Sequence, residues 1–317
     1  MRFYTELVPL GLLVLNGASA APSALIAPEL LARDYTGYDQ CSSAQKDKIN
    51  HALQDAAILA RQVAVNRQPD HGSPQTYRSS PAYTNYFQDS QYGAGVSAMF
   101  NAIGQQSQPP AANSGKPGAG NPITLNQFKV HISCQDDSSC KNAGAGTKSL
   151  VITDAKAISS SFVPTIRFCP QFFQANEART KNNLDSLPYK KNPGRRDSSW
   201  CKAGQKFNAF EVAGTTVLHE LTHLNEAGQR AGLPLNPDGE GGQTHGTDDI
   251  YSKRGYSADP ETAARQLHAN WKKATEKKLP KNKQPPFAET LNADSYAASA
   301  TEWWFMSMCG FDSIAGN

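Results

Sequence analysis

The chain has 317 residues, a formal net charge of +3 and a hydrophobic fraction of 38%. This composition can build a packed core, which excludes a mostly disordered chain, and the charge is too small to favour nucleic acid or an anionic membrane as a partner. Only one strongly apolar run occurs, which excludes a protein that crosses a membrane many times.

That apolar run lies at the N-terminus and predicts a signal peptide over residues 1–20. Arg2 precedes an apolar stretch over residues 7–15, which is too short to span a bilayer. The sequence Ala18-Ser19-Ala20 then resembles a cleavage site for a signal peptidase. We therefore expect a secreted, extracellular protein without a membrane anchor, whose mature chain starts near Ala21.

Residues 21–38 are expected to form a short linker or pro-segment, and residues 39–317 a single domain. Apolar residues at helical spacing predict a first helix that starts after an N-cap at Ser42 or Ser43. The same periodicity predicts a second helix over residues 94–103.

The middle of the chain predicts a loop and then a minor β-sheet. Residues 105–122 are rich in Gln, Pro and Gly, which is typical of a surface loop. Short alternating or apolar runs follow, and these are typical of strands. The candidate strands are residues 128–132, 150–152 and 165–168.

The C-terminal half predicts two further helices. The strongest helical pattern covers residues 208–227, and Gly228 is expected to end it. The last helix is predicted over residues 294–308, with Asp294 as its N-cap and two tryptophans in the core. Because helices outweigh strands, the expected fold class is α+β, mainly helical with a small β-sheet.

The cysteines support an oxidising compartment. They are even in number, and no C-x-x-C pair occurs, which argues against a cysteine zinc site or a thioredoxin-type redox centre. We expect a disulfide-stabilised fold with three bridges, although the residues alone leave fifteen pairings open. The six residues are Cys41, Cys134, Cys140, Cys169, Cys201 and Cys309.

The helix expected over residues 208–227 contains the sequence His219-Glu220-Leu221-Thr222-His223. Histidines at positions i and i+4 lie on one face of a helix, so both imidazoles can reach one Zn²⁺ ion. Glu220 leaves the helix beside them and is placed to take a proton from a metal-bound water. Two solvent-facing histidines on an ordinary amphipathic helix are the alternative interpretation.

A catalytic zinc site needs a third protein ligand and an open fourth position. The longer motif H-E-x-x-H-x-x-G-x-x-H is absent, because Gln229 stands six residues after His223. The candidates further along the chain are His245, Asp248 and Asp249.

The sequence Gly246-Thr247-Asp248-Asp249, followed by Tyr251, resembles the G-T-x-D-x-x-Y-G element of the aspzincins, the deuterolysin-like secreted zinc endopeptidases of fungi. The resemblance implies a zincin-like fold with one Zn²⁺ per chain, bound by the two histidines and an aspartate. It also implies Glu220 as general base and Tyr251 as a group that assists at the transition state. The G-T-x-D spacing selects Asp249 and the D-x-x-Y spacing selects Asp248; we favour Asp249.

The resemblance extends over most of the mature chain. Further family-like elements are the helix led by Cys41, Tyr86-Phe87, the run from Cys169 to Phe173, and the run from Asn292 to Ala297. The resemblance implies a sequential disulfide pairing, Cys41–Cys134, Cys140–Cys169 and Cys201–Cys309.

We therefore expect a secreted, monomeric, zinc-dependent endopeptidase that hydrolyses protein or peptide substrates through a water activated by Glu220. The alternative is a non-catalytic zinc-binding or zinc-scavenging secreted protein on the same scaffold. Related fungal antigens carry Arg in place of the motif Glu, so the Glu at position 220 favours the enzyme.

Overall fold

The computed structural model describes the chain over residues 38–65, 75–88, 93–104, 123–125, 128–136, 138–141, 149–154, 163–184, 201–202, 204–237, 243–251 and 253–317. The predicted signal peptide and the predicted loop at 105–122 lie outside these residues. So does the predicted linker, apart from Tyr38, which is already part of a strand.

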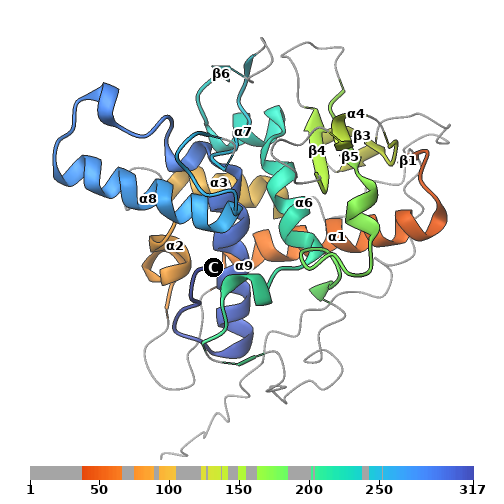
Figure 1. The fold of residues 1–317 in the computed structure, drawn as a ribbon, viewed down its shortest axis with the longest axis horizontal. Helices are drawn as coiled ribbons and strands as arrows, with labels where there is room; N and C mark the ends of the chain where they lie inside the picture. The colour runs from red at the N-terminus through yellow and green to blue at the C-terminus, as the bar shows by residue number, and fades with distance from the viewer. Residues whose placement is uncertain are drawn as a thin grey trace, which may run out of the picture. The chain divides into compact units, whose positions relative to one another are not determined.

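Helices outweigh strands in the described structure, in agreement with the expected α+β class (Figure 1). The described α-helices are α1 (Ser43–Gln62), α2 (Pro81–Thr84), α3 (Gly93–Gly104), α4 (Ser138–Lys141), α6 (Ala213–Thr222), α7 (Asn225–Ala231), α8 (Pro260–Glu276) and α9 (Ala293–Cys309). Helix α6 packs against α1 and α9 and also contacts strand β4 (Val151–Asp154). This helix is therefore the centre of the fold.

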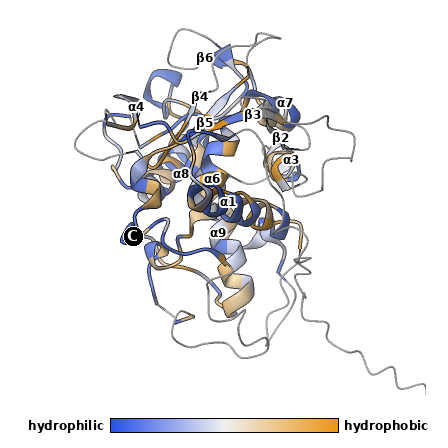
Figure 2. Ribbon diagram, turned by 90° about the vertical axis from the view of Figure 1, so that its right-hand side faces the viewer, coloured by the Kyte–Doolittle hydropathy of each residue, from blue (hydrophilic) through white to orange (hydrophobic). Residues whose placement is uncertain are grey.

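Helix α1 begins where its sequence predicts. Ser42 is the N-cap: its Oγ accepts a hydrogen bond from the backbone N–H of Gln45, and the Gln45 side chain accepts one from the N–H of Ser42. This capping box satisfies two backbone donors at the helix start. Hydrophilic and hydrophobic residues both occur along α1 (Figure 2), and the apolar residues Ile49, Ala56 and Leu59 are fully buried. The helix thus packs as an amphipathic element.

The sheet is small and mixed. Its described strands are β1 (Tyr38–Asp39), β2 (Ile123–Leu125), β3 (Phe128–Ser133), β4 and β5 (Thr165–Phe168). The order is β1-β3-β5-β4, with β2 beside β3; β3 is parallel to β1 and β5, whereas β4 is antiparallel to β5. The three predicted strands are confirmed within a few residues. Strand β4 ends this order, on the side that meets α6.

The prediction of a single helix over residues 208–227 is wrong. Helix α6 ends with its C-cap at His223, and α7 starts at Asn225. Leu224 between them is extended, with ψ of 129°. Gly228 does not end a helix either; it lies inside α7, where a Cβ would stand 1.7 Å from the carbonyl oxygen of His245. The helix ends at Gly232, whose φ of +71° suits glycine.

Helix α9 passes beside α6 and α1 (Figure 1). Its N-cap is Asn292 instead of the predicted Asp294. The prediction that Trp303 and Trp304 belong to the core is confirmed, because the two side chains are 0% and 3% exposed.

Three disulfides link segments that lie far apart in the chain. They are Cys41–Cys134, Cys140–Cys169 and Cys201–Cys309, the pairing that the family resemblance implies. They span 93, 29 and 108 residues, so each removes about 3–5 kcal/mol of unfolded-state entropy in the chain-entropy model. Such bridges fit an extracellular protein.

A membrane-spanning helix would need a long apolar stretch, and none of the described helices has one.

Where α8 meets α9, buried carboxylates outnumber the cationic side chains that pair with them. Glu302 of α9 is 0% exposed; it binds the Tyr86 hydroxyl and the Arg265 guanidinium, and Arg265 also pairs with Glu261. Burial raises the pKa of Glu302 to about 7, although Arg265 opposes the shift. Burial likewise raises the pKa of Glu211 to about 8.

Folding raises the pKa of such a carboxyl group above the value of about 4.3 that it has in the unfolded chain. Its contribution to stability is complete at pH values below the unfolded pKa, and it is lost as the pH rises through the folded pKa. We therefore expect the free energy of unfolding to fall between about pH 4.5 and 7, by up to about 3 kcal/mol from Glu302. Glu302→Gln cannot titrate and should flatten this part of the profile.

Urea unfolding of the oxidised chain at several pH values measures both profiles at constant ionic strength. The difference between the two proteins cancels the histidine titrations, which both share. Parallel profiles for wild type and Glu302→Gln would contradict the prediction.

Candidate metal centre

Helix α6 presents two histidines one turn apart. Its apolar residues Val217, Leu218 and Leu221 are at most 1% exposed, so the core fixes the rotation of the helix. His219 lies on this helix and His223 is its C-cap. Their rings stand with centroids 4.8 Å apart, and the two Nε2 atoms are 3.1 Å apart.

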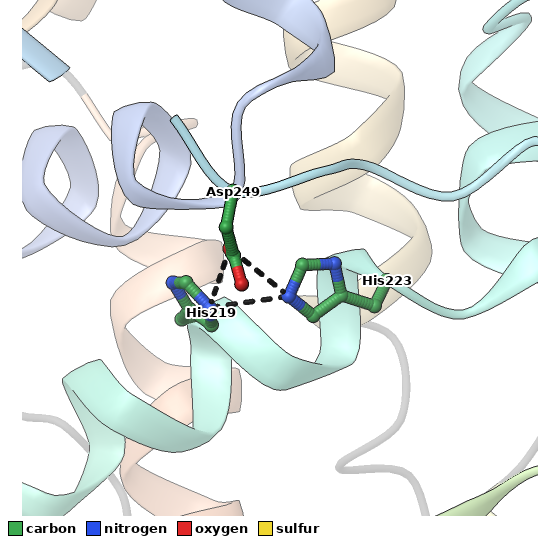
Figure 3. Close-up of side chains that lie close together, drawn as sticks. All are labelled: His219, His223 and Asp249. Carbon is green, nitrogen blue, oxygen red and sulfur yellow. Dashed lines mark hydrogen bonds and ion pairs between the residues drawn. The ribbon is translucent and has the colours of Figure 1, made fainter. Parts of the chain in front are cut away.

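Asp249 approaches the histidines from a segment that runs between α6 and the start of α9. Its Oδ1 lies 3.1 Å from His219 Nε2 and 3.4 Å from His223 Nε2 (Figure 3). These three side chains form a group that could hold a metal ion.

Backbone contacts decide which of the two adjacent aspartates faces the histidines. The N–H of Asp248 donates to the carbonyl of Leu291, and the carbonyl of Asp248 accepts from the N–H of Ala293. This bridge keeps the chain extended at Asp248, and successive side chains in extended chain point to opposite sides. Asp249 therefore points to the histidines, whereas Asp248 is 51% exposed and pairs with Lys253 at 2.8 Å.

A glycine lets this segment lie directly on the end of α6. A Cβ at Gly246 would stand 1.9 Å from the carbonyl oxygen of His223, so only glycine fits. The next residue, Thr247, donates its N–H to the carbonyl of Thr222 at 3.1 Å. The ligand from the segment is thus positioned relative to the ligands from the helix by direct backbone contact.

Hydrogen bonds determine where the two imidazoles carry their protons. His223 Nδ1 lies 2.8 Å from the carbonyl oxygen of Thr247, which can only accept, so Nδ1 carries the hydrogen. His219 Nδ1 lies 2.6 Å from Asp294 Oδ1, and a carboxylate also only accepts. In their neutral form, which is the form that binds a metal, both rings direct the lone pair of Nε2 toward the same point as Asp249 Oδ1.

The three donor atoms fit a metal ion. Zinc ligands at about 2.0–2.1 Å in tetrahedral geometry stand roughly 3.3 Å from one another. The three observed separations are 3.1, 3.1 and 3.4 Å. Two imidazole nitrogens and one carboxylate oxygen are also an ordinary ligand set for zinc, with a fourth position left for a small molecule.

The electrostatics of the site also favour a cation. Burial lowers the pKa of His219, but the carboxylates of Asp294 and Asp249 outweigh it and raise this pKa well above its ordinary value. Burial likewise opposes ionisation of Asp249, yet the two histidines hold the pKa of Asp249 well below its ordinary value. The site thus attracts a proton where it could hold a metal.

Asp294 belongs to the site, although the sequence predicted it only as a helix cap. It is 4% exposed, and its bond to His219 fixes the tautomer and orientation of that ring. Burial raises the pKa of Asp294, although His219 opposes the shift. It lies 75 residues from His219 in the chain, so no local pattern pointed to the pair.

Glu220 and Tyr251, the two predicted catalytic residues, occupy different settings. Glu220 is 6% exposed, and its Oε2 accepts a hydrogen bond from Thr153 Oγ1 at 2.8 Å. Tyr251 is 37% exposed, and its ring centroid lies 6.4 Å from that of His219. The charge of Asp249, with burial second, raises the pKa of Tyr251, so its hydroxyl remains a donor.

His245, the remaining candidate ligand, does not join the group. Its Nδ1 lies 2.6 Å from the carbonyl of Leu233, and its backbone N–H donates to Asn225 Oδ1. It therefore connects the segment before Asp249 to α7 and to the residues that follow α7.

Comparisons with known proteins found no match for this chain among family models, curated proteins or solved structures. The aspzincin resemblance therefore remains a prediction from the motif residues.

The two adjacent aspartates offer a matched test of the ligand assignment. Asp249→Asn should lower zinc affinity by more than about a hundredfold, because loss of a ligand exceeds the effect of losing an outer contact. Asp248→Asn removes the exposed ion pair with Lys253 but keeps an oxygen that can accept the N–H of Asp249, so it should leave affinity unchanged. Competition with a chromophoric chelator measures both; equal effects, or a larger effect at position 248, would contradict the assignment.

Asp294→Asn tests the contact that orients His219. The amide keeps the size of the side chain but not its charge, so we expect a 10- to 100-fold loss of zinc affinity. The same chelator competition measures the loss, with Asp248→Asn as the control for an Asp-to-Asn change. An affinity equal to wild type would show that His219 needs no carboxylate partner.

Proposed function

We propose that this protein is a secreted zinc endopeptidase of the aspzincin type, with one Zn²⁺ per chain. The observation that carries the proposal is the triangle of His219 Nε2, His223 Nε2 and Asp249 Oδ1, next to a glutamate on the same helix. The triangle supplies three ligands and leaves a position open, as catalytic zinc sites do.

When bound, the zinc ion would polarise a substrate carbonyl and make a water molecule more acidic. Glu220 then acts as the general base: it takes one proton from that water and later gives it to the leaving amine, so it ends unchanged. Tyr251 keeps its hydroxyl proton and lies beside the ligands, where it would donate a hydrogen bond to the oxyanion.

The edge of the sheet supports a protein or peptide substrate. Strand β4 is the last in the order of the described strands and packs against α6, which carries His219 and Glu220. An extended peptide can add to such an edge through main-chain hydrogen bonds, which are independent of sequence. We therefore propose that the substrate backbone aligns with β4 and so brings a peptide bond to the metal.

Glu220→Gln tests the proposed chemistry. The amide has nearly the same shape but cannot accept a proton as a base, so peptide hydrolysis should fall by about 10²- to 10⁴-fold. Zinc content should stay at one ion per chain, because Glu220 is not in the ligand group. Cleavage of casein or a quenched peptide library measures activity, and elemental analysis measures zinc.

Glu276→Gln, an exposed change on α8, is the matched control and should behave as wild type. A Glu220→Gln variant that cleaves at the wild-type rate would overturn the mechanism. A wild-type chain that binds zinc tightly but cleaves nothing would support the zinc-scavenging alternative instead.

A further inference from the structure

The carboxylate of Glu220 has one hydrogen-bond partner among the described residues, and that partner comes from the sheet. Thr153 Oγ1 lies 2.8 Å from Glu220 Oε2. The same hydroxyl lies 3.2 Å from the backbone carbonyl oxygen of Glu220. No described residue forms a hydrogen bond with the other carboxylate oxygen, Oε1.

The register of β4 explains why this hydroxyl reaches α6. Thr153 is opposite Ile166 of β5, and residues two apart on a strand share a face. Val151, on the same face as Thr153, is 7% exposed and belongs to the core. On this face of β4, Val151 packs in the core and the hydroxyl of Thr153 contacts Glu220.

We propose that Thr153 is a positioning residue, which holds Glu220 Oε2 so that Oε1 is left to accept the proton from the attacking water. The inference rests on the proposed function. It goes beyond that function because it assigns the orientation of the general base to a hydroxyl of the sheet.

The Thr153 hydroxyl has two acceptors within reach but only one hydrogen. A carboxylate attracts that hydrogen more strongly than a neutral carbonyl does, so the hydroxyl is directed to Oε2 and the backbone oxygen at 3.2 Å is the weaker contact.

Three variants test the role of the hydroxyl in catalysis. Thr153→Val keeps the branched shape without the hydroxyl and should lower kcat by about 10- to 100-fold with little change in KM, because misplacement of a reacting group acts on the chemical step. Thr153→Ser keeps the hydroxyl and should recover most of kcat. Thr165→Val makes the same exchange on β5 and should match wild type.

A double-mutant cycle gives a second readout that does not depend on activity. In the zinc-free oxidised chain, Thr153→Val should lower the equilibrium constant for folding by about tenfold or more, as expected for a hydrogen bond to a charged group. In a Glu220→Leu background, which has no side-chain acceptor for the Thr153 hydroxyl, the same change should have a much smaller effect. Urea unfolding measures all four proteins.

The outcomes separate this inference from the proposed function. If wild type cleaves peptides but Thr153→Val keeps its kcat, or if Thr153→Ser is as impaired as Thr153→Val, the positioning role is overturned. Additive effects in the cycle would also overturn it, because the two side chains would then not interact. A zinc-loaded wild type without activity would instead reject the proposed function, and the cycle would still report on the contact.

Discussion

The site depends on one constraint: the lone pairs of two imidazole nitrogens and one carboxylate oxygen point to the same place. Acceptors bind both Nδ1–H groups, so Nε2 of His219 and Nε2 of His223 face each other at 3.1 Å, with Asp249 Oδ1 beside them. Such an arrangement is unfavourable without a cation between the atoms. A proton can fill that role in the metal-free chain, so proton binding and metal binding compete for the same position.

The structure meets this constraint by surrounding α6 with elements that are far apart in the chain. Strand β4 contacts Glu220, the segment at Thr247 contacts Thr222 and His223, and α9 supplies Asp294. Each contact fixes one side chain or one backbone group of the helix. The disulfide Cys201–Cys309 closes a loop that contains both α6 and most of α9, which limits how far these elements can separate in the unfolded chain.

Local features of the sequence predicted the parts of the structure that depend on local physics. The capping box at Ser42, the alternating strand at residues 128–132 and the histidine pair all involve neighbours within a few residues. The break between α6 and α7 was not predicted, because Leu224 is a good helix former. It adopts an extended conformation where the segment from His245 packs against Gly228, which is a tertiary effect.

The remaining site residues show why spacing alone could not complete the site. In an extended chain, side chains point alternately to one side and the other, so a shift by one residue exchanges inward and outward side chains. The choice between Asp248 and Asp249 depends on this alternation. The bridge between Asp248 and Asn292, which lie 44 residues apart in the sequence, determines which of the two aspartates points inward. Asp294 and Thr153 reach the helix over 75 and 67 residues. Since the folded chain alone brings these groups together, any metal ion that they bind would add its binding free energy to the free energy of folding.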